Sequence, residues 1–333
     1  MRTRVAINGF GRIGRSVLRA WALAHRGRWP KVEIRAINDV APLETCAYLF
    51  EFDSVFGPYP GTVEVAENAL IVDGRTIPFT RIAAPGDMNL TGVDILMECT
   101  GRARDRAVAE AGLTAGAARV LISGPSPKAD LTLVLGANDA AILPRHRIIS
   151  NASCTTNAIA PLMRLLDDAY GLETALVTTV HCYTGSQPTV DAPAGDNLAR
   201  SRAAALSMVP TSTSAEHLVD LVLPHLAGRI TGSAVRVPTA SVSAVDMAVI
   251  TREAPQAEEV RARFSAASGP IIGYTDRPLV SADLRARSES VIIAGPEIKR
   301  ARGGMLRVFG WYDNEWGFSC RMLDVAHRMG VQE

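Results

Sequence analysis

The chain has 333 residues, of which 47% are hydrophobic and 21% charged, and its 35 Lys and Arg against 34 Asp and Glu give a net charge of +1. This balance is that of an ordinary globular protein and argues against binding to nucleic acid or to an anionic membrane. The length favours two domains, and no run approaches the roughly 18 apolar residues of a membrane span.

The five cysteines are odd in number and scattered, at Cys46, Cys99, Cys154, Cys182 and Cys320. No C-x-x-C pair occurs, so the sequence predicts neither a metal site nor a disulfide framework. A strand-like pattern begins at residue 4, and we therefore expect no signal peptide. Reduced cysteines are typical of the cytosol, so a cytoplasmic location is expected.

A dinucleotide-binding pattern occupies the first forty residues, with a strand at 4–8, the glycine-rich turn GFGRIG at 9–14, a helix at 15–26 and a strand at 31–39. In such a turn Gly9 permits the tight bend, Gly11 lets the backbone approach a pyrophosphate, and Gly14 lets helix and strand pack closely. The helix N-terminus favours the anion. Asp39 would bind the ribose hydroxyls and repel a 2′-phosphate, so we expect NAD rather than NADP. The alternative is a glycine-rich turn without a ligand.

Strand and helix patterns continue to alternate up to residue 151. The apolar runs at 93–101, 119–124, 131–138 and 147–151 are typical of strands, and 104–117 is typical of a helix. This alternation predicts an α/β fold with a doubly wound parallel sheet, so we expect a Rossmann domain over residues 1–150.

The pattern changes beyond residue 170. Long segments rich in Val, Thr and aromatic residues lie at 173–185, 232–250 and 304–317, with helical patterns at 256–269 and 318–329. We expect a second, α+β domain over residues 151–315, built on a mixed or antiparallel sheet. A C-terminal helix over 316–333 is expected to pack back on the first domain. The polar stretch at 185–205 is long for a loop, and such loops are more often functional or interfacial.

Cys154 lies in NASCTTN, between a strand pattern and a helical one, and His181 lies in TTVHCYTG. A helix N-terminus favours a thiolate, and a nearby histidine would complete a nucleophile–base pair. The alternative is a small buried side chain near a turn. Spacing alone leaves both interpretations open.

Five motifs occur in order along nearly the whole chain: VAINGFGRIGR, NASCTTN, TTVH-x-YT, VRVPT and WYDNEWG. Together they resemble the phosphorylating glyceraldehyde-3-phosphate dehydrogenase family, which includes the closely related erythrose-4-phosphate dehydrogenases. The resemblance implies an NAD-dependent oxidation of D-glyceraldehyde 3-phosphate to 1,3-bisphosphoglycerate. Cys154 would be the nucleophile that forms a thiohemiacetal and then a thioester, and His181 the acid/base.

Other roles are also implied by this resemblance. Thr184 and Arg236 match the site for the substrate phosphate. The site for the attacking inorganic phosphate is matched by Ser153, Thr155, Arg202 and Thr213, with Ser214 where the family usually has glycine. Asn314 matches the residue that holds the nicotinamide carboxamide, and Arg12, Ile13 and Ser123 match other cofactor contacts. Residues 182–205 match an S-shaped loop that packs against a neighbouring subunit, which implies a homotetramer.

Three other functions remain open at this point. One is the oxidation of erythrose 4-phosphate, with water resolving the thioester. Another is a dinucleotide-binding regulator that has lost catalysis, and the third is a Cys/His hydrolase, which would give no reason for the glycine pattern or Asp39. The departures Phe56, Ala83, Ser214 and Phe318 bear on the preferred aldehyde.

Overall fold

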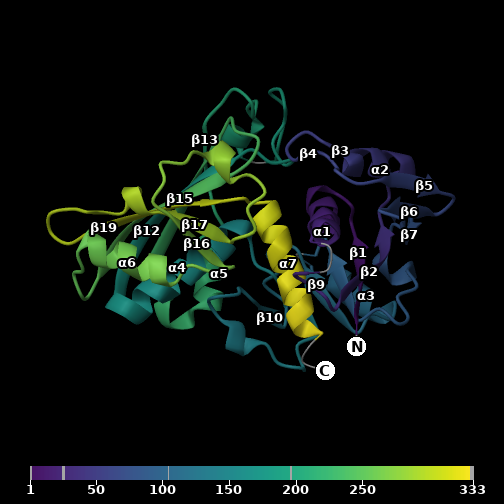
Figure 1. Ribbon diagram of the computed structural model, residues 1–333, viewed down its shortest axis with the longest axis horizontal. Coiled ribbons are helices and arrows are strands. Elements are labelled where there is room, and N and C mark those ends of the chain that lie inside the picture. The colour runs from purple at the N-terminus through teal and green to yellow at the C-terminus, as the bar shows by residue number, and fades with distance from the viewer. Residues whose placement is uncertain (1, 25–26, 104, 196, 331–333) are drawn as a thin grey trace. The chain divides into compact units, whose positions relative to one another are not determined.

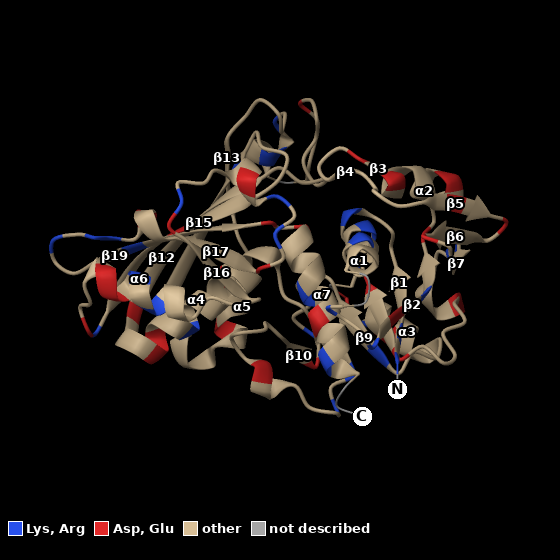
Figure 2. Cartoon of the chain, in the orientation of Figure 1, with Lys and Arg blue, Asp and Glu red and all other residues tan. Residues whose placement is uncertain are grey.

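The computed structural model describes residues 2–24, 27–103, 105–195 and 197–330 (Figure 1). Parts of four expected elements lie outside these residues: 25–26 and 104 in two helices, 196 in the polar loop and 331–333 in the C-terminal helix. Basic and acidic residues are interspersed along the elements (Figure 2). No helix of the described residues is both long and apolar enough to cross a bilayer.

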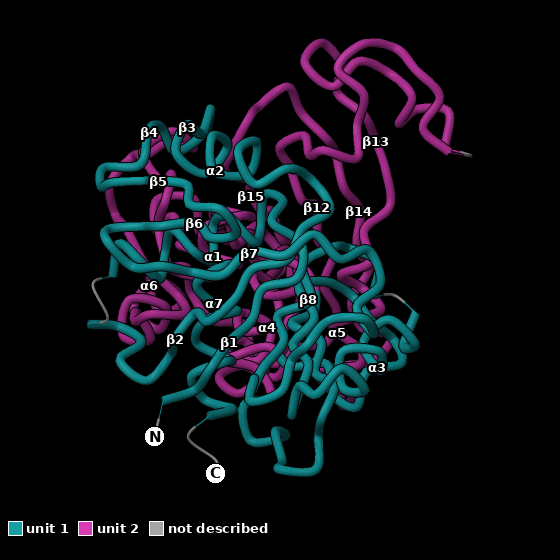
Figure 3. The backbone as a smooth tube through the Cα atoms, turned by 90° about the vertical axis from the view of Figure 1, so that its right-hand side faces the viewer, with its two compact units in different colours: residues 1–133, 139–152, 319–333 teal, residues 134–138, 153–318 magenta. Residues whose placement is uncertain are grey.

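The chain divides into two compact units (Figure 3). Unit 1 consists of residues 1–133, 139–152 and 319–333, and unit 2 of residues 134–138 and 153–318. The helix that begins at Cys154, the long strands and the polar loop all belong to unit 2, whereas the glycine-rich turn belongs to unit 1.

Unit 1 is built on a nine-stranded sheet in the order β10-β11-β9-β8-β1-β2-β7-β6-β5. Its strands are β1 (Thr3–Asn8), β2 (Val32–Asn38), β5 (Val63–Ala66), β6 (Ala69–Val72), β7 (Arg75–Thr80), β8 (Ile95–Glu98), β9 (Arg119–Ile122), β10 (Leu131–Thr132) and β11 (Ile148–Ser150). All pairs from β10 to β7 are parallel, and β5, β6 and β7 pair antiparallel. In the central β1, residues 5–7 are apolar and buried on both faces, as is typical of parallel strands. The predicted parallel sheet is confirmed.

The helices of unit 1 are α1 (Arg12–Leu23), α2 (Leu43–Glu51), α3 (Arg106–Thr114) and, from residue 319 onward, α7 (Trp316–Met329). Short elements are β3 (Phe52–Asp53), β4 (Gly57–Pro58), η1 (Pro85–Asp87) and η2 (Asp139–Ala141). Asp324 of α7 accepts hydrogen bonds from the Trp29 indole, at 2.5 Å, and from the fully buried Arg321. Arg119 of β9 donates to the carbonyl of Met329. The contacts with Trp29 and Arg119 fix α7 within unit 1.

Unit 2 is built on an eight-stranded mixed sheet in the order β13-β14-β12-β15-β19-β17-β16, with β18 paired to β19. Its strands are β12 (Leu172–Cys182), β13 (Val209–Ser212), β14 (Ile230–Val237), β15 (Ser243–Thr251), β16 (Ile272–Thr275), β17 (Val291–Ala294), β18 (Lys299–Arg300) and β19 (Leu306–Tyr312). Only β12–β14 and β16–β17 are parallel pairs. The expected mixed sheet is confirmed, and the segment 232–250 forms two of its strands, β14 and β15.

The helices of unit 2 are α4 (Cys154–Tyr170), α5 (Ala215–Val222) and α6 (Ala257–Ala266), with 3₁₀ turns η3 (Leu198–Ser201), η4 (Pro224–Leu226), η5 (Ser281–Leu284) and η6 (Gly295–Glu297). α4 packs on β12, β15 and β17, α5 on β14, and α6 on β16. On β12 the alternate side chains of Leu176 and Val180 are exposed, as is Ile250 on the neighbouring β15. These apolar side chains mark a face of the sheet that is open in the single chain.

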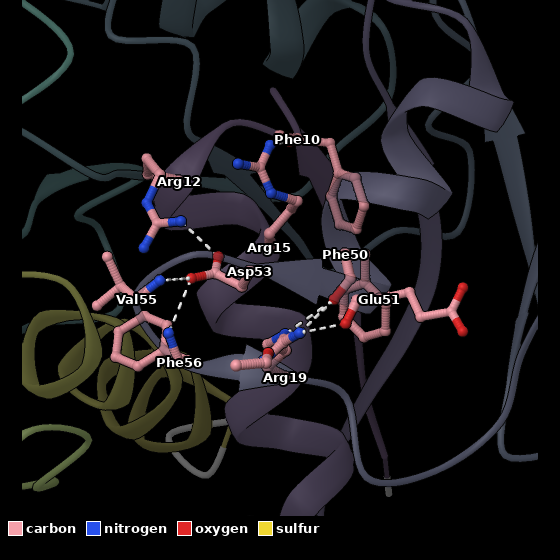
Figure 4. A network of polar contacts seen from close by, with 10 residues as sticks. Phe10, Arg12, Arg15, Arg19, Phe50, Glu51, Asp53, Val55 and Phe56 are labelled. Carbon is pink, nitrogen blue, oxygen red and sulfur yellow. Dashed lines mark hydrogen bonds and ion pairs between the residues drawn. The ribbon is translucent and has the colours of Figure 1, made fainter.

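Figure 4 shows how α1 is attached to the segment that follows α2. Asp53 accepts hydrogen bonds from the backbone N–H groups of Val55 and Phe56 and forms an ion pair with Arg12. About two turns further along the helix is the buried Arg19, whose guanidinium donates to the carbonyls of Phe50, Glu51 and Gly57. A buried arginine that is satisfied by main-chain oxygens makes this attachment specific.

We predict that Arg19→Leu lowers the free energy of unfolding by about 2–4 kcal/mol, because buried carbonyls lose their donors. Urea titration monitored by circular dichroism measures the change. Arg35→Leu, at an exposed arginine of β2, is the matched control and should change stability by less than about 0.5 kcal/mol. Equal effects of the two substitutions would show that Arg19 does not hold the segment.

Candidate functional sites

The glycine-rich turn between β1 and α1 is close-packed on one side and open on the other. Gly9 has a φ of +91°, and a Cβ there would lie 2.7 Å from backbone atoms of Cys99 and Thr100. A Cβ on Gly14 would overlap the carbonyl oxygen of Gly9, whereas a Cβ on Gly11 would meet nothing within 4 Å. Gly9 and Gly14 are therefore required by packing, and Gly11 leaves room for a ligand to approach the backbone.

α1 begins at Arg12, within the glycine-rich segment, and its N-cap residue Gly11 provides no side-chain hydrogen bond. The N-terminus of a helix this long carries partial positive charge and favours an anion. Ile13 lies in its first turn. The guanidinium of Arg12 is held by Asp53 and stacks over the Phe56 ring at 5.5 Å, so this side chain serves the attachment described above.

A pocket of about 300 Å³ opens at the carboxyl ends of β1, β2 and β8. Its lining includes Asn8, Gly9, Gly11, Asp39 and Thr100. Because β2 and β8 flank β1 on opposite sides, this is a switch point of the sheet, where open α/β folds bind ligands. The Asp39 carboxylate accepts hydrogen bonds from the N–H groups of Phe10, at 2.6 Å, and Ala41, at 2.9 Å, which fix it in the pocket. The open backbone at Gly11 and this oriented acid fit a dinucleotide.

Three strand-terminal residues that sequence reasoning missed support the pocket. The amide of Asn8 donates to Glu98, at 2.5 Å, and accepts from Asn38, at 2.8 Å. Glu98 also accepts from the N–H of Thr100. Each of the three is the last residue of its strand, a position that could have indicated them. Ser123, one residue beyond β9, donates its backbone N–H to the carbonyl of Glu98.

In unit 2, Cys154 is the first residue of α4, and the Ser153 hydroxyl caps this helix by accepting from the N–H of Thr156. The expected position at a helix N-terminus is confirmed. Cys154 is half-buried, and its Sγ lies 3.7 Å from Nε2 of His181, near the end of β12. The structure thus brings together the two residues whose contact the spacing left open.

The imidazole of His181 is held by the carbonyl of the next residue. Nδ1 lies 2.7 Å from the Cys182 oxygen, and Arg236 Nη1 lies 3.0 Å from the same oxygen and 2.8 Å from Nδ1. A carbonyl accepts two hydrogen bonds, so Nδ1–H and the guanidinium can both donate to it. Nε2 then carries the lone pair that faces the Cys154 thiol, which is the arrangement of a base.

The surroundings keep both members of this pair neutral. Burial, together with the Arg236 charge, lowers the pKa of His181 to about 4. Burial also raises the pKa of Cys154, and it outweighs the opposing effects of the Arg236 charge and the start of α4. The expectation of a lowered thiol pKa from the helix N-terminus is therefore wrong, because removal from water dominates. His181 is left free to accept a proton.

Tyr312, at the end of β19, is a further neighbour that sequence reasoning missed. Its ring meets the His181 imidazole edge-on, with centroids 6.0 Å apart. Its hydroxyl lies 2.9 Å from Thr155 Oγ1 and 2.7 Å from Thr179 Oγ1, and Thr179 donates to the carbonyl of Ala244. With Thr179's proton committed, Tyr312 donates to Thr179 and accepts from Thr155. The Thr155 hydroxyl is thereby held inside the fold.

Of the residues expected around the substrate phosphate, Arg236 lies beside His181. The buried Nε of Arg236 has no hydrogen-bond partner among the described residues. Thr184 Oγ1 lies 3.0 Å from the Ser186 hydroxyl, which also accepts from Arg200. Burial lowers the pKa of Arg236, and the charge of Arg200 acts in the same direction. Two cations and an unpaired donor are an environment that favours an anion.

The residues expected around the attacking phosphate are more dispersed. Ser153 and Thr155 lie at the start of α4, whereas Thr213 and Ser214 lie at the start of α5, where Thr213 accepts from the N–H of Ala215. Arg202 is exposed and forms an ion pair with Asp191 at 2.9 Å. Its expected role as a phosphate ligand stays a prediction.

Comparisons with known proteins agree with this geometry. Residues 3–106 match the family model described as glyceraldehyde 3-phosphate dehydrogenase, NAD binding domain, and residues 153–314 match the model of its C-terminal domain. The chain is 47% identical to a glyceraldehyde-3-phosphate dehydrogenase of Xanthobacter flavus and 46% identical to one of Cereibacter sphaeroides, over 99% of each chain. It is 44% identical to one of Pseudomonas aeruginosa over 98% of each chain.

The lowered pKa of His181 predicts a pH-dependent stability. In the unfolded chain the imidazole has a pKa of 6.5, so as pH falls the unfolded state takes up the proton first. Stability is then lost between about pH 6.5 and pH 4, by about 3 kcal/mol in total. Unfolding titrations at several pH values should show that His181→Asn reduces this slope. His217→Asn, at an exposed histidine of α5, should leave it unchanged; identical slopes in all three proteins would contradict the assignment.

Proposed function

The chain belongs to the glyceraldehyde-3-phosphate dehydrogenase family and is an NAD-dependent oxidoreductase, and we propose that it oxidises D-glyceraldehyde 3-phosphate to 1,3-bisphosphoglycerate with inorganic phosphate as acyl acceptor. The observation that carries this proposal is the contact between the Cys154 thiol, at the start of α4, and a neutral His181 Nε2. A thiol beside an imidazole base is the arrangement of nucleophilic catalysis on a carbonyl.

In the first half of the reaction, His181 Nε2 takes the thiol proton as Cys154 Sγ attacks the aldehyde carbon. His181 then returns the proton to the resulting oxyanion, which gives a thiohemiacetal. When the hydroxyl proton passes back to Nε2, the carbon loses a hydride and becomes a thioester. The acceptor of this hydride is NAD. The Nδ1–H bond to the Cys182 carbonyl keeps the ring in the orientation that each transfer needs.

In the second half, an oxygen of inorganic phosphate attacks the thioester carbon. The carbon–sulfur bond breaks, the acyl phosphate leaves, and Cys154 recovers the proton held by His181. We assign Arg236 and Thr184 to the substrate phosphate, on the basis of the unpaired Nε and the nearby Arg200. Ser153, Thr155, Arg202, Thr213 and Ser214 are assigned to the attacking phosphate.

We assign cofactor binding and substrate binding to two different parts of the chain. Residues 1–150 are proposed to hold NAD through Gly9, Gly11, Arg12, Ile13, Gly14, Asp39 and Ser123, and residues 151–315 the aldehyde. The pocket at the switch point supports the first assignment, and the Cys154–His181 contact supports the second. Asn314, in the second part, is proposed to bind the nicotinamide carboxamide.

We further propose that the chain forms a homotetramer. One face of the unit 2 sheet exposes Leu176, Val180 and Ile250, whereas its helices cover the other face. Leu198, Leu206 and Met208 are also exposed, in and just beyond the loop 182–205. Large exposed apolar side chains that cluster on regular elements are typical of surfaces that a partner covers.

Dependence on inorganic phosphate tests the proposed reaction. In phosphate-free buffer, glyceraldehyde 3-phosphate should yield one NADH per active site and then stop, because the thioester has no acceptor. Phosphate or arsenate should restore turnover. A steady rate without phosphate, on this aldehyde or on erythrose 4-phosphate, would instead support the alternative in which water resolves the thioester.

Two substitutions separate the phosphate sites in the same assay. Arg236→Leu should slow the first NADH burst about ten- to a hundredfold, because a charge-assisted contact to the substrate phosphate is lost. Arg202→Leu should spare the burst and slow later turnovers. Arg302→Leu, at an exposed arginine between β18 and β19, should change neither phase. Slowing of the burst by Arg202→Leu alone would reverse the two assignments.

The position of the Asp39 carboxylate predicts a preference for NAD over NADP. The unmutated protein should bind NAD more tightly than NADP, because the carboxylate repels a 2′-phosphate. Asp39→Ala should narrow the ratio of the two dissociation constants about tenfold. We use the ratio of the two dissociation constants because the carboxylate also accepts hydrogen bonds from two backbone N–H groups, so Asp39→Ala also destabilises the fold. Asp87→Ala, at an exposed acid of η1, controls for net charge, and equal affinities in the unmutated protein would refute the role of Asp39.

A further inference from the structure

Asn314, just beyond β19, is buried together with two side chains that both lie at its amide oxygen. Cys182 Sγ is 3.1 Å from Asn314 Oδ1, and Ser243 Oγ is 3.3 Å from the same atom. Their exposed fractions are 1% for Cys182, 1% for Ser243 and 6% for Asn314. The three residues come from the end of β12, the start of β15 and the segment after β19, all within unit 2.

The donors in this cluster can be assigned from the remaining contacts. Ser243 Oγ accepts the backbone N–H of Cys182 at 3.1 Å, so its own hydrogen can be donated to Asn314. Burial raises the pKa of Cys182 to about 12, so this thiol keeps its proton and also donates. A reversed amide would leave both hydrogens without an acceptor, and sulfur accepts only weakly. Oδ1 therefore faces the two donors.

This orientation fixes what Asn314 offers to a ligand. With Oδ1 engaged twice, the Nδ2 group is the free end of the amide, and it donates to no group among the described residues. An N–H₂ group that has no acceptor in the protein is available to donate to a ligand. A carbonyl oxygen is the matching acceptor.

We propose that Cys182 and Ser243 are positioning residues that hold the Asn314 amide with Nδ2 directed as a donor to the carboxamide oxygen of the nicotinamide. This inference rests on the proposed function, in which Asn314 binds that carboxamide. Cys182 then has two tasks: its carbonyl orients the base His181, and its thiol orients the cofactor-binding Asn314. The base and the carboxamide donor are anchored to one residue.

The test compares two ligands that differ in the nicotinamide. Isothermal titration calorimetry gives dissociation constants for NAD and for ADP-ribose, which keeps the adenosine and pyrophosphate but lacks the nicotinamide. Cys182→Ala and Ser243→Ala should each weaken NAD binding about three- to tenfold and change ADP-ribose binding by less than about twofold. Cys182→Ser should restore NAD affinity, because a hydroxyl can donate to Oδ1.

Equal weakening of both ligands would overturn the inference, because it would indicate a general packing role. Unchanged NAD affinity in Cys182→Ala and Ser243→Ala would overturn it as well. Asn314→Ala separates this failure from that of the proposed function. If Asn314→Ala selectively weakens NAD while the other two variants do not, only the positioning role falls. If Asn314→Ala leaves the ratio of NAD to ADP-ribose affinity unchanged, the assigned role of Asn314 falls with it.

Discussion

The chemistry available to Cys154 depends on one main-chain oxygen, the carbonyl of Cys182. It accepts hydrogen bonds from Nδ1 of His181 and from the guanidinium of Arg236. The first bond places the proton on Nδ1 and leaves the Nε2 lone pair facing the thiol. The second keeps a positive charge beside the ring, which together with burial holds the imidazole neutral. The carbonyl thus sets the tautomer of the imidazole, and burial together with the Arg236 charge sets the neutral state that a base requires.

The register of the unit 2 sheet brings these groups to one place. β12 and β14 run parallel with His181 opposite Arg236, and β15 and β19 run antiparallel with Ser243 opposite Tyr312. Because side chains alternate between the two faces of a strand, a slip of one residue between β12 and β14 would remove the guanidinium from the imidazole. The hydrophobic pattern of the long strands therefore also specifies the site, since it determines which pairing buries the apolar face.

The sequence predicted the parts of the fold that periodicity reveals. The glycine-rich turn, the alternating strands and the helix at Cys154 all follow from local patterns. Strands β5 to β7 and helices α2 and α5 were missed, because they are short and their pattern is interrupted by turns. Contacts such as those of Tyr312 and Ser243 could not be predicted, because sheet neighbours are far apart in sequence. The Cys154 pKa was mispredicted for a related reason: a helix N-terminus can be recognised in a sequence, whereas burial of a side chain depends on the whole fold.

Several polar groups around Cys154 either lack a hydrogen-bond partner in the chain alone or are buried beside a charge. The Arg236 Nε is buried without a partner, the Asn314 Nδ2 lacks an acceptor among the described residues, and His181 is buried beside a cation. Burial of the unpaired Arg236 Nε costs about 1–3 kcal/mol, and the lowered pKa of His181 costs stability below about pH 6.5. The concentration of these groups along one end of four adjacent strands, β14, β12, β15 and β19, suits a function in which ligands supply the missing partners. An anion would pair with Arg236, a carbonyl with Asn314, and a proton in transfer with His181, so the polar groups that the protein does not fully pair are the ones best prepared to bind.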